Sequence, residues 1–144
     1  MSKKTDEELL MHSICHLRTI KDVYMECGSY EKLKTNLIYY DSVLHNLTQV
    51  GEMANQFSEE FMNDHKNIPV RDIYGLRCAI THHYDKVESH DIYGVIKKDV
   101  PDLLNLYRNI LVNEYGFSDE YILENVSHFR YTREYLFKSN EDRR

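Results

Sequence analysis

Two side chains near the middle of the chain have the types to act on a phosphate. Arg77 and His82 belong to the densest polar cluster on an apolar background, which extends to Tyr84. An arginine guanidinium is a permanent cation that matches phosphate oxygens, and a histidine exchanges protons near neutral pH. Metal-free cleavage of RNA needs a base for the ribose 2′-OH, an acid for the leaving 5′ oxygen and a cation for the charge on phosphorus. One arginine and one histidine do not easily fill all three roles.

The separation of Arg77 and His82 adds a geometric constraint. Residues five apart on a regular α-helix point about 140° away from each other. The two side chains therefore meet only if the helix frays or turns at His82, or if a second protomer presents its own copy across a two-fold axis. The second arrangement also supplies a second histidine, so that two identical chains provide both a base and an acid.

A purely structural interpretation of the same residues stays open at this level. Arg77 could form a salt bridge with an acidic neighbour, and His82 could bond the carbonyl groups at the end of its helix, where a cation is favourable. Short Arg/His spacings are common, so the spacing alone is a weak motif.

The composition predicts an all-α protein. The chain has 144 residues, of which 42% are hydrophobic and 29% charged, so it can form a core and is neither disordered nor membrane-spanning. Only 5 glycines and 2 prolines are present, too few turn-formers for a many-stranded sheet. The formal net charge of −6 gives no general attraction for nucleic acid. We therefore expect neither a DNA nor a membrane partner, and any RNA contact must be local.

The cysteines and the N-terminal sequence favour a cytoplasmic location. Cys15, Cys27 and Cys78 are an odd number and lack the spacing of a metal site. No secretory segment precedes the first charged residues, Lys3 and Lys4. We therefore expect a reducing compartment.

A metal site is also not expected. His12 and His16 are one helical turn apart and could in principle form a ligand pair. Two ligands do not complete a zinc site, and no second pair at matching spacing is present. The sequence thus predicts neither a metal nor a cofactor.

Hydrophobic periodicity predicts four helices that form an antiparallel bundle around the cluster. The first helix covers about residues 5–27, and the second covers residues 31–54 as one unbroken helix. Gly51 inside the second helix costs about 1 kcal/mol relative to alanine, which favours close packing of another helix at that point. The third helix covers about residues 69–84, and the fourth covers residues 89–111 with a kink at the second proline.

The composition shifts near residue 116. We divide the chain into a helical bundle at residues 1–115 and a helical extension with a basic tail at residues 116–144. Aromatic side chains beside cations stack on bases, so the extension could guide RNA to the cluster; alternatively it packs on its own bundle or on a second protomer. The residues concerned are His128, Arg130, Tyr131, Arg133 and Tyr135.

The string Arg77-x4-His82-x-Tyr84 resembles the Arg-x4-His-x-Tyr signature of the HepT-like HEPN ribonuclease toxins. The likeness covers about residues 9–112, and helix order, spacing and motif all match. It includes Val50-Gly51-Glu52 in the second helix, residues 68–73 before the motif and residues 100–103 after it.

The resemblance implies a HEPN-like four-helix bundle that forms a homodimer or a higher even oligomer. Two motifs would face a common cleft that cuts RNA, either tRNA or mRNA, without a metal. HepT-like proteins are usually encoded beside a minimal nucleotidyltransferase antitoxin, in HEPN/MNT systems of type VII, which transfers AMP to the motif tyrosine. Carried onto this sequence, Arg77 stabilises the scissile phosphate, His82 transfers protons and Tyr84 is the AMPylation site. AMP on Tyr84 would add bulk and negative charge next to Arg77.

Three neighbours are candidates for supporting roles. Glu52 could orient Arg77 or His82 from the adjacent helix, or be an ordinary surface carboxylate. His83 has no role in the signature and is either a solvated neighbour or a second proton carrier. Cys78 stands where the family commonly has a polar residue, often asparagine, and a thiol cannot donate and accept hydrogen bonds as an amide does. The alternative is therefore a catalytically weak or inactive HEPN module that binds a nucleotide or the nucleotidyltransferase.

Overall fold

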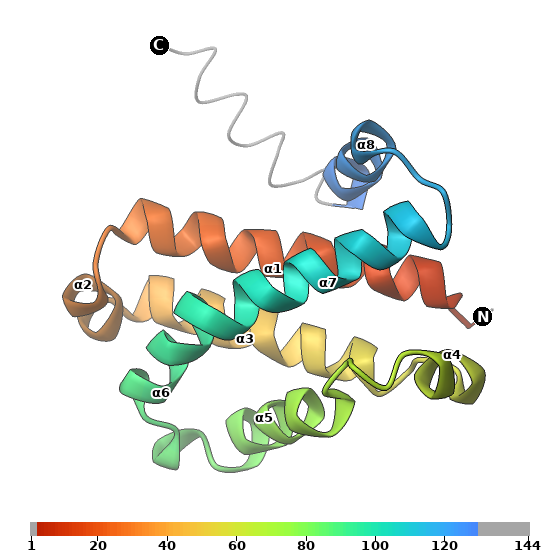
Figure 1. Ribbon diagram of the computed structural model, residues 1–144. Coiled ribbons are helices and arrows are strands. Elements are labelled where there is room, and N and C mark those ends of the chain that lie inside the picture. The colour runs from red at the N-terminus through yellow and green to blue at the C-terminus, as the bar shows by residue number, and fades with distance from the viewer. Residues whose placement is uncertain (1–2, 130–144) are drawn as a thin grey trace, which may run out of the picture.

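Long helices pack side by side in the computed structural model, which describes residues 3–129 (Figure 1). These residues form helices and contain no strand. The expectation of an all-α bundle with an additional C-terminal helix is therefore confirmed. The principal helices are α1 (Asp6–Cys27), α3 (Leu37–Ala54), α5 (Val70–His82) and α7 (Val100–Asn113); the shorter ones are α2 (Tyr30–Thr35), α4 (Glu59–Asp64), α6 (Ser89–Gly94) and α8 (Asp119–Phe129).

Helix α1 lies at the centre of the bundle and contacts α3, α7 and α8. It begins as predicted at Thr5, whose hydroxyl oxygen accepts the Glu8 amide at 3.2 Å. It ends at Gly28, whose φ of 96° is the left-handed conformation that glycine adopts without strain. Its apolar face is removed from solvent and forms the middle of the core, with Leu9, Leu10, Ile14, Leu17 and Ile20 each at most 2% exposed.

The prediction of one unbroken helix over residues 31–54 is wrong, because the helix is interrupted at Asn36. Asn36 has φ −114° and ψ 103°, outside the helical region, and it separates α2 from α3. Its side-chain oxygen accepts the amides of Ile38 at 3.0 Å and Tyr39 at 3.4 Å. Asparagine is a strong N-cap residue, so this local bond favours a new helix start over continuation. Leucines keep the helical period across Asn36, so periodicity alone did not indicate the interruption.

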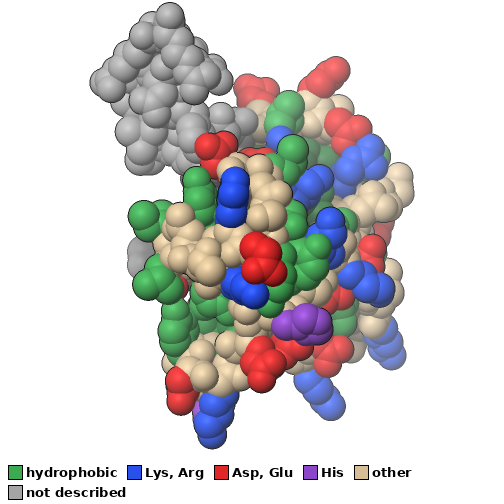
Figure 2. All heavy atoms as spheres, turned by 90° about the vertical axis from the view of Figure 1, so that its left-hand side faces the viewer, with side chains coloured by type: hydrophobic (Ala, Val, Ile, Leu, Met, Phe, Trp, Pro, Cys, Tyr) green, Lys and Arg blue, Asp and Glu red, His purple; other side chains and the backbone are tan. Residues whose placement is uncertain are grey.

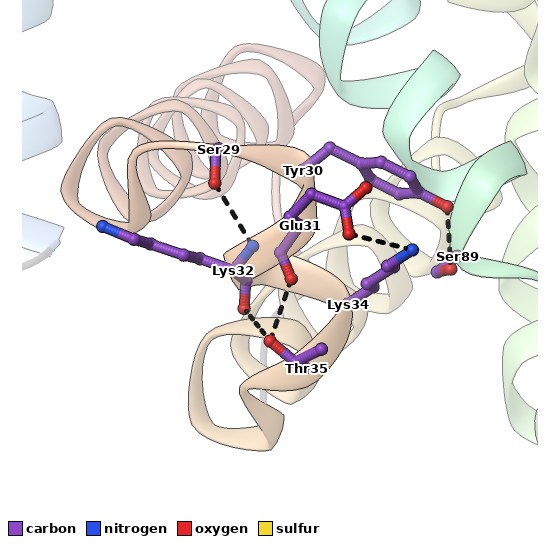
Figure 3. Close-up of polar contacts among 7 residues, drawn as sticks. All are labelled: Ser29, Tyr30, Glu31, Lys32, Lys34, Thr35 and Ser89. Carbon is purple, nitrogen blue, oxygen red and sulfur yellow. Dashed lines mark hydrogen bonds and ion pairs between the residues drawn. The ribbon is translucent and has the colours of Figure 1, made fainter.

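Helix α2 is a short turn held against α6 at one end of the bundle. Figure 3 shows the hydrogen bond of 3.1 Å between the hydroxyls of Tyr30 and Ser89, which joins the two helices. In the same view Ser29 caps α2 by accepting the Lys32 amide at 3.2 Å. Figure 2 looks onto this end, where acidic and basic side chains intermingle and hydrophobic side chains gather along one edge.

The predicted kink in the fourth helix is present as a π-helical segment rather than as a break. Residues Val95–Asp99 are π-helical and connect α6 to α7, and a proline follows at the start of α7. Proline lacks an N–H and cannot complete the regular ladder, so a local widening of the helix accommodates it. The segment stays in the core through Ile96, which is 3% exposed.

Helix α8 packs on the bundle as the first part of the C-terminal extension. Ile122 and Val126 are buried in the same core as α1. Nε and Nη2 of Arg108 donate to the two carboxylate oxygens of Asp119, each at 2.7 Å, and this bidentate contact joins the start of α8 to α7. The basic tail, together with the His128 side chain, lies outside the described part of the structure. Within residues 3–129, no helix is both long and apolar enough to cross a membrane.

Candidate active site

Helix α5 carries Arg77 and His82 without an interruption between them. The helix stays regular to its last residue, His82, and the chain turns only at His83, whose amide still donates to the Ala79 carbonyl at 2.8 Å. The fraying that would bring Arg77 and His82 together within one chain does not occur. The two side chains therefore point about 140° apart, and one chain offers only part of the required set of groups.

Arg77 is fixed by a close contact between α5 and α3. Gly51 is buried on α3, and a Cβ atom placed there would collide with the Cβ of Arg77 and lie 3.1 Å from both its Cγ and the Ile73 carbonyl oxygen. Glycine is thus the residue that allows α5 to approach α3 at the height of Arg77. The prediction that Gly51 marks close helix packing is confirmed.

Glu52 follows Gly51 on α3 and forms an ion pair with Arg77, between Oε1 and Nε. The two side chains are 36% and 23% exposed, respectively, and the Nε atom itself is buried. The approach is that of an ion pair rather than of an aligned hydrogen bond. In the part of the chain that the structure describes, nothing hydrogen-bonds the two terminal nitrogens of Arg77. These two nitrogens are therefore available to a ligand.

Tyr74 and Cys78 flank Arg77 on α5. The Arg77 Cζ atom lies 5.7 Å from the centroid of the Tyr74 ring, a cation–π contact. Interaction with the Cys78 thiol, four residues along the same helix, is the main cause that raises the pKa of Tyr74. The sequence analysis missed Tyr74, although its spacing of three from Arg77 and four from Cys78 places all three on one face.

Tyr84 lies just past the helix, in the single 3-10 turn Tyr84–Lys86. Its side chain is 51% exposed, and its hydroxyl donates to Asp41 Oδ1 on α3 at 2.8 Å. This bond to a carboxylate, followed by partial burial, raises the pKa of Tyr84. Asp41 is a further residue that the sequence analysis missed. The two residues are 43 positions apart, and no local pattern connects them.

Arg77 and Tyr84 are anchored at different heights on α3. Their partners, Glu52 and Asp41, are eleven residues apart on one helix, which corresponds to about 16 Å along its axis. The sequence-based expectation placed AMP on Tyr84 next to Arg77. Within one chain, an adenylyl group would have to extend along α3 to reach Arg77. His82, which lies between Arg77 and Tyr84 in the sequence, is exposed.

The histidines of α1 have other surroundings. His16 Nδ1 lies 2.8 Å from Asn46 Oδ1. Burial, followed by the charges of Lys4 and His16, lowers the pKa of His12. No group of three or more ligating side chains that could hold a metal ion occurs among the described residues.

The family of the protein follows from a comparison with known sequences. The family model described as "Ribonuclease HepT-like" matches residues 14–107. The chain belongs to the HepT-like ribonuclease family. The family recognised from the signature is thereby confirmed, and the match includes the Arg77, His82 and Tyr84 positions as well as Asp41 and Glu52 on α3.

Two named relatives of this HepT-like chain come from a bacterium and an archaeon. "Putative RNase TTE0752" of Caldanaerobacter subterraneus subsp. tengcongensis is 27% identical over 86 residues, which are 60% of this chain and 77% of the relative. "Putative RNase MJ1380" of Methanocaldococcus jannaschii is 22% identical over 103 residues, which are 72% of this chain and 94% of the relative. No solved structure matches the HepT-like chain significantly.

Proposed function

We propose that this HepT-like chain is a cytoplasmic endoribonuclease toxin whose site forms between two protomers. The observation that carries the proposal is the geometry of α5. Arg77 is braced by Glu52 on one side of the helix, whereas His82 stands exposed at its end on another side. A second copy related by a two-fold axis supplies the groups that one chain cannot direct at the same phosphate.

The reaction uses two histidines in opposite roles. One His82 removes the proton from the ribose 2′-OH, and that oxygen attacks phosphorus. The bond from phosphorus to the 5′ oxygen breaks, and the His82 of the second protomer gives that oxygen a proton. The two Arg77 side chains balance the negative charge that grows on the phosphate oxygens. Glu52 is a positioning residue because its contact with Nε directs the terminal nitrogens of Arg77. His83, which follows His82, is either a second proton carrier or a solvated neighbour.

The test is RNA cleavage by purified protein in EDTA, together with growth inhibition after expression. Arg77→Ala and His82→Ala should each lower cleavage about 100-fold or more, since each removes a group that acts on the transition state. Arg71→Ala and His90→Ala are matched controls, because both residues are exposed and lie outside the motif. Circular dichroism checks the fold. A wild-type protein that never cuts RNA and is harmless to cells contradicts the proposal.

Regulation acts through Tyr84 in the same proposal. A minimal nucleotidyltransferase antitoxin transfers AMP to the exposed Tyr84 hydroxyl, and the added group blocks RNA from the shared site by its bulk and its charge. The support is that Tyr84 is half exposed at the end of the motif-bearing segment. Intact mass after incubation with the nucleotidyltransferase and ATP should rise by whole AMP units, and Tyr84→Phe should stay unmodified. Mass gain in both proteins would place the modification elsewhere.

A second candidate function is a catalytically weak module that binds a nucleotide or the nucleotidyltransferase. The observation that favours it is Cys78, which places a thiol rather than a side-chain amide directly after Arg77 on α5. Cys78→Asn discriminates between the two. An increase in cleavage of about tenfold or more would show that the thiol limits the enzyme, whereas an inactive wild type that stays inactive as Cys78→Asn, yet still binds its partner, supports the module.

A further inference from the structure

We propose that Asp41 is the catalytic base for nucleotidyl transfer to Tyr84. This inference rests on the proposed modification of Tyr84 and names a group of the target protein that takes part in it. Neither the motif nor the family match assigns a role to Asp41. The role is argued from the contact between α3 and the 3-10 turn that follows α5.

The geometry places a carboxylate at the atom that would react. The Tyr84 hydroxyl donates a hydrogen bond to Asp41 Oδ1 at 2.8 Å, the distance over which a base accepts a proton from a nucleophile. Both residues are exposed, so a nucleotide presented by a second enzyme can approach the oxygen. The 3-10 turn is closed by the Lys86 amide, which donates to the His83 carbonyl at 2.8 Å. The Tyr84 backbone therefore belongs to a defined turn, and its hydroxyl has a defined partner.

The electrostatics explain why a base is needed. The bond to the Asp41 carboxylate is the main cause that raises the pKa of Tyr84, so the phenol keeps its proton before reaction. A neutral phenol is a weak nucleophile, and its activation requires an adjacent base. The carboxylate that accepts the hydrogen bond of the phenol in the resting protein is also the group that receives the proton as the new bond forms. An aspartate serves protein kinases in this way, by accepting the proton of the substrate hydroxyl.

The step balances as follows. The Tyr84 oxygen attacks the α-phosphorus of a nucleoside triphosphate bound by the nucleotidyltransferase, and the new oxygen–phosphorus bond forms. The bond from the α-phosphorus to the pyrophosphate oxygen breaks, and pyrophosphate leaves with the electron pair. The phenolic proton passes to Asp41 Oδ1 and then to water. The product is a phosphodiester on Tyr84, which can no longer donate to Asp41 and places a second negative charge beside it.

The experiment measures the initial rate of AMP incorporation into Tyr84 by intact mass, using the nucleotidyltransferase and ATP. Asp41→Asn keeps an oxygen that can accept the phenol but removes its basicity, and Asp41→Ala removes both. We expect both variants to be slower than the wild type by about 100-fold or more, the range of general-base catalysis. Asp85→Asn is the matched control, since it removes the exposed carboxylate next to Tyr84 in sequence and should leave the rate unchanged. Urea unfolding checks that each variant is folded.

Added formate provides a readout that a structural role would not move. Formate should restore part of the rate to Asp41→Ala, because that variant lacks only the carboxylate. It should restore none to Tyr84→Phe, which has no hydroxyl to receive AMP. A normal rate for Asp41→Asn overturns the inference, and with a slow Asp41→Ala it shows that Asp41 merely positions the phenol. If the wild type gains no AMP, or gains it on another residue, the proposed modification itself fails and the role of Asp41 fails with it.

Discussion

Gly51 and Arg77 face each other across the α3–α5 contact so closely that no side chain fits between them. The glycine stands directly before Glu52, so this close approach of the two helices lies next to the ion pair that holds the guanidinium. A backbone feature and a charge therefore fix the same side chain. The arrangement makes the position of Arg77 depend on the absence of a methyl group on the neighbouring helix.

The Gly51→Ala substitution is expected to displace Arg77. Overpacking costs about 1–3 kcal/mol, and the better helix propensity of alanine offsets about 1 kcal/mol of this. We therefore expect a small loss of unfolding free energy in urea but a loss of RNA cleavage of tenfold or more. Gly75→Ala on α5 is the control, because a Cβ there meets nothing within 4 Å and should preserve cleavage. Equal cleavage by the two variants would show that the close contact does not position Arg77.

Mixing the wild type with His82→Ala tests the site between protomers. A heterodimer keeps both Arg77 side chains but only one His82, so a shared site lacks either its base or its acid and should be inactive. Cleavage should therefore fall as the square of the wild-type fraction in the mixture. The measurement is activity against the mixing ratio after joint refolding, with native mass spectrometry to count heterodimers. Cleavage that falls only in proportion to the wild-type fraction would contradict a shared site.

Glu52→Gln tests the positioning of Arg77 without a change in side-chain volume. The pair is partly exposed, so its loss should change the unfolding free energy by less than about 1 kcal/mol. We expect kcat for RNA cleavage to fall about tenfold with a smaller change in KM, because the guanidinium still binds phosphate but is less well directed. Glu59→Gln, at an exposed position on α4, is the control. A change in KM alone would indicate that Glu52 acts only on binding.

Local signals in the sequence were sufficient for the helices whose ends carry strong caps. Thr5 and Gly28 determine the ends of α1 through bonds and conformations that depend on a few neighbouring residues. Asn36 carries an equally local cap, but Leu33 and Leu37 keep the helical period across it, and periodicity cannot distinguish one helix from two in register. The exposure of Leu37, at 68%, becomes evident only in three dimensions.

The site could be predicted only in part for a related reason. Arg77 and His82 lie five residues apart, so a motif contains them both. The contact of Asp41 with Tyr84 joins α3 to the turn after α5, and such a pairing depends on the packing of the two helices rather than on any spacing. The contact of Glu52 with Arg77 is one of the alternatives that the sequence left open, beside a contact with His82 and an ordinary surface carboxylate.

Tyr107 offers a test of the hydrophobic core. Its ring is fully buried and meets Phe57 edge-on at 6.0 Å, and its hydroxyl is buried without a hydrogen-bond partner among residues 3–129. Burial strongly raises its pKa. An unpaired buried hydroxyl costs about 1–3 kcal/mol, so Tyr107→Phe should leave the melting temperature unchanged or raise it. A decrease of more than about 1 kcal/mol in the free energy of unfolding of Tyr107→Phe would mean that the hydroxyl has a hydrogen-bond partner.

His65 should make the stability of the protein depend on pH. Its Nδ1 lies 2.8 Å from the Phe61 carbonyl oxygen and its Nε2 lies 2.7 Å from Glu114 Oε1. Both partners accept hydrogen bonds, so both ring nitrogens must carry a proton, which is the imidazolium form. Burial is the largest single effect and lowers the pKa of His65, but the bonds to Phe61 and Glu114 together outweigh it, and the pKa is raised.

Because the folded pKa of His65 lies above its ordinary value of 6.5, the protonated form stabilises the folded state. This contribution is fully present below about pH 6.5 and is lost as the pH rises through the folded pKa. Glu114→Gln should lower the pKa of His65 in an NMR titration and reduce the difference in unfolding free energy between pH 6 and pH 8. Glu124→Gln, at an exposed position on α8, should leave both quantities unchanged. An unchanged His65 titration in Glu114→Gln would show that this carboxylate does not stabilise the imidazolium.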